Sequence, residues 1–268
     1  MHLAAGLKIP CLAIFLATAQ PWDTGPYLPG CCCLEPAMGC HPCAYGYACP
    51  YGQACRQCIG SQSVGDLVLA WLDSGSWGTA FKKSSHIRSE ARVWLTQKDS
   101  HGFAALRCLS GHESEDRSLW LNSQRLFWRH ILDCLSRPKP DTATANNGGS
   151  AEADDGQGTF LCSPAEAGKI PAFSPAFAAK MCDCLTQSVN LLHLLEEQGL
   201  LVGRSATAGQ LFLRNCERLQ NLLDANAAFT ALGGFWRELR QQRGGHMDDL
   251  IDLIRQLKNS LILWKQSL

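Results

Sequence analysis

Hydrophobic residues recur every three to four positions in four segments of the chain, the spacing that places them on one face of an α-helix. These segments are Ser118–Leu135, Ser174 to the residue before Gly199, Thr207–Leu232 and Met247–Trp264. Pro138 should end the first helix, and Pro175 suits the first position of the second. The pattern predicts a mainly α fold, with a helical C-terminal domain after a cysteine-rich, loop-like N-terminal segment.

Each of the last three helices has a distinct apolar face. The predicted inner residues are Met181, Cys184, Leu185, Leu192 and Leu195 in the first of them, Leu211, Phe212, Cys216, Leu219, Leu222 and Leu223 in the next, and Leu250, Leu253, Ile254, Leu257, Leu261 and Trp264 in the last. The faces around Leu219–Leu223 and Leu250–Trp264 have two interpretations. They either pack on each other, the commoner fate of such stripes, or bind a protein partner.

The hydrophobic pattern and the local composition together divide the chain into five parts. They are a candidate signal peptide at 1–19, a cysteine-rich segment at 20–60, a globular segment rich in tryptophan at 61–137, a linker at 138–159 and a helical domain at 160–268. Pro138–Thr159 contains no large apolar residue, so it cannot bury enough surface to offset its chain entropy.

Charge limits the classes of partner. The 268 residues include 24 Lys and Arg against 24 Asp and Glu, so the formal net charge is zero. This excludes a protein whose whole surface binds nucleic acid and leaves only local basic patches. One such patch, on a single helix, would contain Lys82, Lys83, Arg88, Arg92 and Lys98, although a solvated face is the commoner role.

No apolar run reaches the roughly 18–20 residues that cross a bilayer, so we expect a soluble chain.

Cysteines supply the one dense group of chemically active side chains. Eight of the 15 lie within the 28 positions from Cys31 to Cys58, in a segment with too few large aliphatics for its own core. The candidate metal ligands are Cys40, Cys43, Cys49, Cys55 and Cys58, which include two Cys-x2-Cys pairs. Thiolates at this spacing converge on Zn2+ in tetrahedral sites. A disulfide knot, or a merely cysteine-rich segment, accounts for the same pattern.

The compartment is open to two interpretations. Ala17-Thr18-Ala19 follows a short apolar stretch and resembles a signal-peptidase site, and cleavage there would remove Cys11 and leave 14 of the 15 cysteines, an even number suited to disulfides. The chain has no Asn-x-Ser/Thr site, and Cys134, Cys182, Cys184 and Cys216 lie within helical patterns beside Leu or Met. Buried free thiols behave as small hydrophobes, so these cysteines also fit a reducing compartment.

Two C-terminal segments resemble the regulatory domain of fungal aflatoxin-pathway-type transcription regulators, which carry a Zn2Cys6 module. Met181–Glu197 reads MCDCLTQSVNLLHLLEE, with an Asp-Cys-Leu start and paired leucines, and Ala208–Leu223 resembles a later helix of the family. Met247–Trp264 would complete the domain. The block Cys31–Cys58 departs from the family, because it lacks the Cys-x2-Cys-Arg-x2-Lys core and Arg56 is its only basic residue.

The resemblance implies a nuclear regulator of a fungal secondary-metabolite gene cluster, with a degenerate zinc module. Such a chain would act through protein partners, with DNA as a possible second partner that it binds weakly and without sequence specificity. The alternative is a secreted, disulfide-stabilised protein without enzymatic activity. We expect no enzyme, no small-molecule substrate and no cofactor other than zinc, since the sequence has no nucleophile elbow, P-loop, dinucleotide fingerprint or His-Glu-x-x-His motif.

Overall fold

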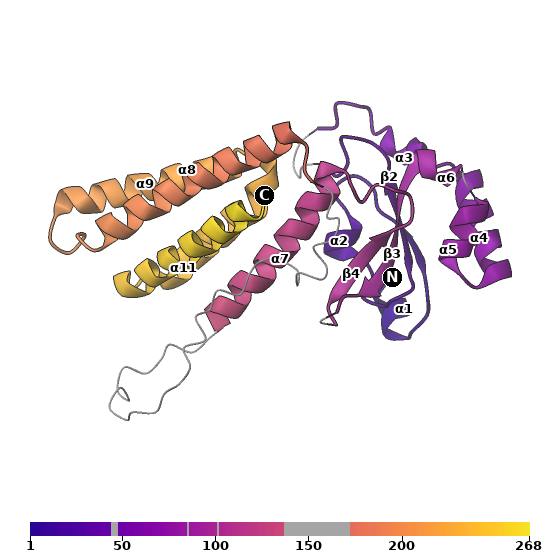
Figure 1. Cartoon of the computed structure of the whole chain (residues 1–268), viewed down its shortest axis with the longest axis horizontal. Coiled ribbons are helices and arrows are strands. Elements are labelled where there is room, and N and C mark those ends of the chain that lie inside the picture. Colours follow the sequence, from indigo (N-terminus) through magenta and orange to yellow (C-terminus); the bar gives the residue numbers. More distant parts are fainter. Residues whose placement is uncertain (44–47, 85, 101, 137–171) are drawn as a thin grey trace, which may run out of the picture. The chain divides into compact units, whose positions relative to one another are not determined.

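The computed structural model describes residues 1–43, 48–84, 86–100, 102–136 and 172–268, with only the backbone of 134–136 (Figure 1). These residues form two compact units, Met1–Ser118 and Leu119–Leu268, which we call the N-terminal unit and the helical unit. The boundary falls inside the segment 61–137 that the sequence analysis treats as one part. The expected linker at 138–159 lies outside the described residues, as does part of the expected domain at 160–268.

Helices dominate the described residues, which confirms the mainly α prediction. The N-terminal unit contains α1 (His2–Gly6), β1 (Leu12–Ile14), α2 (Pro21–Thr24), β2 (Cys32–Pro36), α3 (Cys55–Cys58), α4 (Ser61–Ser74), α5 (Trp77–Lys83), α6 (Ile87–Glu90), β3 (Ala91–Lys98) and β4 (Ala104–Cys108). The remaining elements are α7 (Asp116–Ser136), which crosses the boundary, α8 (Pro175–Gly199), α9 (Ala206–Asp224), the 3-10 turn η1 (Ala227–Phe229), α10 (Thr230–Arg243) and α11 (Met247–Gln266). No described helix combines the length and the apolar character that a membrane span requires.

The N-terminal unit is built on a sheet of order β1-β2-β3-β4 (Figure 1). β1 pairs parallel with β2, and the other two pairs are antiparallel. Five residues of the segment that was expected to be loop-like therefore form a strand, and every residue of β2 is buried. The cysteine-rich segment lacks a core of its own, but β2 lies between β1 and β3, and these strands supply the core around it.

The two faces of this sheet carry separate apolar clusters. One surrounds Cys32 and Leu34 with Leu67, Ile87 and Val93, which come from α4, α6 and β3. The other joins Phe15, Cys33 and Trp94. Alternate side chains of a strand point to opposite faces, so neighbouring cysteines of β2 enter different clusters.

The first 19 residues pack into this unit. They supply β1 and the buried Phe15, and the carbonyl oxygen of Ala17 accepts a hydrogen bond from the amide of Cys43 at 2.8 Å. Cleavage after Ala19 would remove all of these contacts and leave β2 as an edge strand of the sheet.

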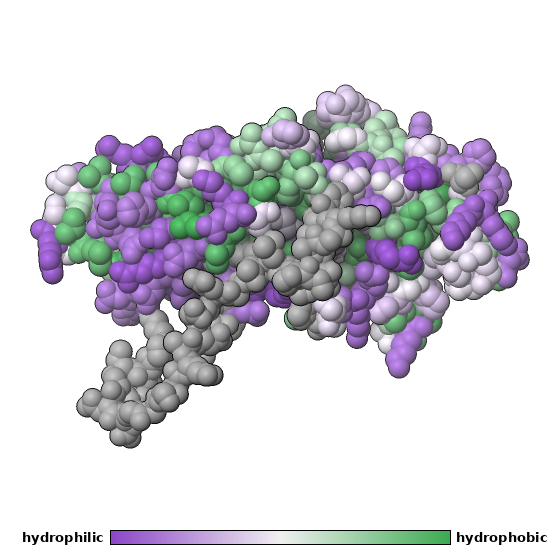
Figure 2. Space-filling view, viewed as in Figure 1, coloured by the Kyte–Doolittle hydropathy of each residue, from purple (hydrophilic) through white to green (hydrophobic). Residues whose placement is uncertain are grey.

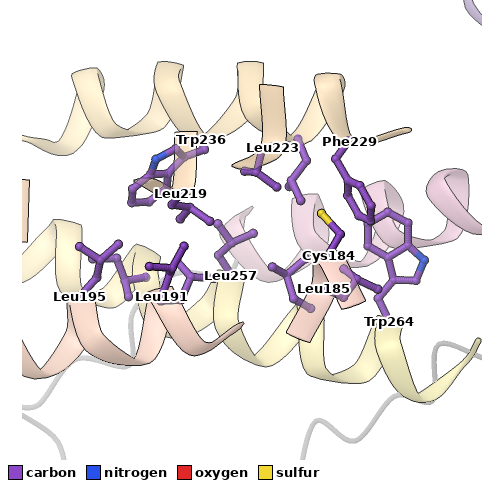
Figure 3. Packing of buried hydrophobic residues seen from close by; sticks show 14 of the residues in the cluster. Cys184, Leu185, Leu191, Leu195, Leu219, Leu223, Phe229, Trp236, Leu257 and Trp264 are labelled. Atoms are coloured by element: carbon purple, nitrogen blue, oxygen red, sulfur yellow. The ribbon is translucent and has the colours of Figure 1, made fainter. Parts of the chain in front are cut away.

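One core holds the helical unit together. α8 packs against both α9 and α11, and the three run side by side in Figure 1. Leu185, Leu219 and Leu257, one from each of these helices, all belong to this core, as Figure 3 shows. The faces around Leu219–Leu223 and Leu250–Trp264 are thus buried together in one core, and the docking interpretation of these two faces is wrong. On the side shown in Figure 2, hydrophilic side chains cover much of the outer surface of these helices, between smaller hydrophobic areas.

Sequence periodicity located three of the helices closely. α7, α8 and α11 match the expected segments to within two residues at each end. Ser174 caps α8 as its Oγ accepts a hydrogen bond from the amide of Phe177 at 3.4 Å, and Pro175 occupies the first position.

The helix expected at Thr207–Leu232 is wrong at its C-terminal end. α9 stops at Asp224, and the Oδ1 atom of Asn226 accepts a hydrogen bond from the amide of Ala228, which starts the turn η1. Asparagine favours such local side-chain to backbone bonds over a helix interior. The chain then enters α10, which the sequence analysis did not predict. Leu211, expected on the inner face of α9, is 39% exposed.

Candidate functional site

The five candidate metal ligands lie in and before α3. Cys55 and Cys58 occupy the two ends of this helix, and Cys40, Cys43 and Cys49 lie on the connection that follows β2. Cys55 is buried, Cys49 is exposed and the other three are half-buried. The connection itself is only partly within the described residues.

Three of these thiols lie within electrostatic reach of a fourth, Cys43. Burial raises the pKa of Cys43, and the neighbouring thiols of Cys49, Cys55 and Cys40 raise it further. Cys58 has another partner, since its Sγ atom donates a hydrogen bond to the carbonyl oxygen of Glu90 at 3.2 Å. The arrangement places Cys40, Cys49 and Cys55 around Cys43 and ties the fifth cysteine to the last residue of α6.

A zinc site would require closer contact than this region shows. Four thiolates bind Zn2+ at about 2.3 Å each, which brings their sulfur atoms within about 4 Å of one another. Across the residues that the structure describes, no three His, Cys, Asp or Glu side chains form such a group. Zinc binding by the cysteine block therefore stays a prediction, and it requires the block to close around the ion.

We expect the full-length chain to bind one zinc ion and to release it on chelation, with a loss of order in the block, because binding and folding are coupled in such modules. The thiols must lose their protons to bind, so binding should weaken as the pH falls. Metal analysis after dialysis measures the stoichiometry. The double variant Cys43→Ser/Cys49→Ser should lose most of the metal, whereas Cys182→Ser, outside the block, should keep it. A wild-type chain that takes up no zinc would contradict the prediction.

The best-defined polar site is a buried carboxylate that the sequence analysis missed. Glu35 lies in β2 with a side chain that is 0% exposed. Its Oε1 atom accepts hydrogen bonds from Trp94 Nε1 at 3.1 Å and Arg117 Nη1 at 2.7 Å, and its Oε2 atom accepts one from Arg117 Nη2 at 3.1 Å. Arg117 Nη2 also donates to Gln20 Oε1 at 3.0 Å. This network joins residues that lie up to 97 positions apart.

His41 adds a titratable group to the Glu35 network. Its Nδ1 atom lies 3.5 Å from Glu35 Oε2, and its Nε2 atom lies 3.1 Å from the carbonyl oxygen of Ala19. Burial lowers the pKa of His41, against the attraction of Glu35, and the positive charges of Arg117 and Arg92 lower it further. Glu35, Trp94 and His41 are buried, while Arg117 and Gln20 are partly exposed, so the network links β2, β3, α7 and the segment before α2 within the N-terminal unit.

The lowered pKa of His41 predicts a pH dependence of stability. The unfolded chain binds a proton at His41 near pH 6.5, whereas the folded chain does so only at a lower pH, so the free energy of unfolding should fall as the pH drops below about 6.5. Burial lowers the pKa of His112 as well, which adds to the same slope. Hydrogen exchange of the β2 and β3 amides between pH 5 and 7.5 measures it.

The variant His41→Gln should flatten this slope. The matched control is His193→Gln, because His193 is an exposed residue of α8. An unchanged slope in His41→Gln would contradict the assignment.

The basic residues do not form the single patch that was considered. Lys82 and Lys83 end α5, Arg88 lies in α6, and Lys98 ends β3. Arg92 is buried in β3, where its guanidinium donates to Glu115 Oε2 and to the carbonyl oxygen of Pro36, each at 2.8 Å. Arg88 Nε donates to the carbonyl oxygen of Ser110 at 2.9 Å. The prediction of one basic helix is wrong, because these residues are divided among α5, α6 and β3.

In the helical unit, the Asp-Cys-Leu motif lies beside an open hollow of about 610 Å³. The hollow is bordered by Asp183, Cys184, Lys180 and Gln187 of α8 and by the turn around Asn226. Burial raises the pKa of Cys184, and a hydrogen bond with Asn226 opposes that shift. Figure 3 shows Cys184 among the leucines of the core. The motif thus connects the N-terminal half of α8 to the end of α9.

The thirteen described cysteines are all free thiols. Cys184 and Cys216 are buried in the helical core and Cys182 is half-buried, while the side chain of Cys134 and the whole of Cys162 lie outside the described residues. The buried pair fills space as small apolar side chains do.

Comparison of the chain with protein-family models, with curated proteins and with solved structures gives no match.

Proposed function

We propose that the chain is a nuclear regulator of a fungal secondary-metabolite gene cluster that acts through protein partners. One observation carries the proposal. The two segments that resemble the fungal regulatory domain coincide with α8 and α9, which pack together and share one core with α11. The Asp-Cys-Leu start of the first segment contributes Cys184 and Leu185 to that core.

The positions of the basic residues support action through partners. Lys and Arg side chains neutralise phosphates, and Arg56 is the only such residue within the cysteine block. Arg92 is buried and Arg88 is bonded to the backbone, so neither is freely available to a phosphate. A chain with no net charge and a single Lys or Arg in its cysteine block should bind DNA weakly through that block.

We therefore expect weak, non-specific DNA binding by the isolated full-length chain, with a shallow salt dependence. Gel-shift titration over promoter fragments between 50 and 200 mM salt measures both properties. Tight, sequence-selective binding with a steep salt slope would show that the chain contacts DNA directly and would contradict this part of the proposal.

The role in transcription has a direct test. The full chain, fused to an unrelated DNA-binding module, should change expression of a reporter gene several-fold in a fungal host. The variant Leu219→Asp places a charge in the helical core and should abolish the effect, whereas Leu213→Ala, at an exposed position of α9, should retain it. A fusion protein that is folded and nuclear but leaves the expression of the reporter gene unchanged would contradict the proposal.

The packing of the N-terminus favours this proposal over secretion. A secreted form cleaved after Ala19 would lose β1, Phe15 and the carbonyl that faces His41.

A further inference from the structure

We propose that Cys11 and Cys31 form a redox-active thiol pair, which glutathione disulfide converts into a disulfide bond between the first strand and its neighbour. The pair lies outside the five candidate zinc ligands and is independent of the role in transcription.

The strand register places the two cysteines opposite each other. β1 and β2 pair in parallel with Leu12 opposite Cys32, so the preceding residues, Cys11 and Cys31, form the next pair. The amide of Cys32 donates to the carbonyl oxygen of Cys11 at 2.9 Å, which extends the ladder to this position. Neighbouring strands lie about 4.8 Å apart, within the range of about 4.4–6.8 Å between Cα atoms that a disulfide requires.

The side chains of the pair lie on the same face of the sheet. Paired residues of adjacent strands point the same way, and the face shared by Cys11 and Cys31 is that of Ala13 and Cys33. The two thiols are close enough to interact, because Cys31 raises the pKa of Cys11. Cys32 points to the opposite face, and Cys33 lies opposite Ala13, so Cys31 is the partner within reach of Cys11.

Exposure sets the order of the chemical steps. Cys11 is half-buried and Cys31 is fully buried, so a solvent oxidant meets Cys11 first. The Cys11 thiolate attacks one sulfur of glutathione disulfide, the S–S bond of the oxidant breaks, and one glutathione thiolate leaves and takes up a proton. The Cys31 thiolate then attacks Sγ of Cys11, and the second glutathione leaves in the same way. Two protein thiols lose two electrons and two protons, and one glutathione disulfide gains them as two thiols.

The buried surroundings of Cys11 make its reaction with glutathione disulfide slow at neutral pH. Burial raises the pKa of Cys11 to about 11, with a further increase from Cys31. The attacking thiolate is therefore scarce, and its fraction rises about tenfold per pH unit below that pKa. Oxidation should accelerate accordingly between pH 7 and 9.

Peptide mapping of the full-length chain tests the proposal. After incubation with glutathione disulfide, the remaining thiols are blocked with N-ethylmaleimide. Cleavage before Asp23 and after Met38 then separates Cys11 from a fragment, Asp23–Met38, whose only cysteines are Cys31, Cys32 and Cys33. We expect these two fragments to stay linked without reductant, and fragmentation by mass spectrometry should place the bond at Cys31.

Variants provide the matched comparison. Cys33→Ser should leave the link intact, and Cys31→Ser should reduce it at least tenfold while glutathione accumulates on Cys11. A bond from Cys11 to any other cysteine in the wild-type chain, or a stable glutathione adduct on Cys11 with no link, would overturn the proposal. The wild-type mapping decides the outcome even if Cys31→Ser does not fold.

Discussion

The variant Trp264→Ala should lower the free energy of unfolding of the helical unit by about 3–5 kcal/mol, the usual cost of removing a large buried aromatic side chain. Trp264 is 1% exposed, and its ring stacks on Trp120 at 4.7 Å and on Phe127 at 4.4 Å between centroids. Its Nε1 atom donates to Ser123 Oγ at 2.6 Å. Truncation would remove these three contacts with α7 and leave a cavity.

The measurement must report on this unit alone, because a chain with two units need not unfold in a single step. Native-state hydrogen exchange of the α8 and α11 amides provides such a readout. Leu213→Ala is the control, since Leu213 is 65% exposed and its truncation should cost under about 0.5 kcal/mol. A loss below about 1 kcal/mol in Trp264→Ala would contradict the packing described for α11.

The variant Glu35→Ala should lower the free energy of unfolding of the N-terminal unit by about 3 kcal/mol, the lower end of the cost of breaking a buried ion pair. It leaves the guanidinium of Arg117 without its carboxylate and Trp94 Nε1 without an acceptor. The lower end applies because the Arg117 side chain is 22% exposed and water replaces part of the lost contact.

Glu35→Gln is the matched control, because it keeps the volume and an acceptor for Trp94 but removes the charge. We expect a smaller loss, about 1.5 kcal/mol. Hydrogen exchange of the β2 and β3 amides measures both variants. Equal stability of Glu35→Ala and the wild-type chain would mean that the carboxylate does not hold the unit together.

Most of the helical unit could be predicted from the sequence, because the patterns that specify its helices lie within each helix. The spacing of Leu250, Leu253 and Leu257 identifies one face of α11 without knowledge of its partners, and Ser174-Pro175 marks the start of α8. The break after α9 was missed because Leu222, Leu223 and Leu232 continue an apolar pattern across a turn that depends on the side chain of Asn226.

The sheet and its buried carboxylate depend on distant residues. Cys31-Cys32-Cys33-Leu34 is a short apolar run whose period indicates neither helix nor strand, and its partners lie at Leu12–Ile14 and Ala91–Lys98. Glu35 reaches Arg117 across 82 positions, which no local pattern encodes. The one available signal was a single charged residue directly after that apolar run.

The central claim, a regulator inside the cell rather than a secreted protein, is tested most directly by the thiol state of the chain isolated from its cells. The protein is denatured without reductant, labelled with a maleimide and analysed by mass spectrometry together with its N-terminal peptide. We predict that all 15 cysteines label, or all except Cys11 and Cys31, in a chain that retains residues 1–19. Few free thiols in a chain that begins at Gln20 would contradict the claim and establish the secreted, disulfide-stabilised alternative.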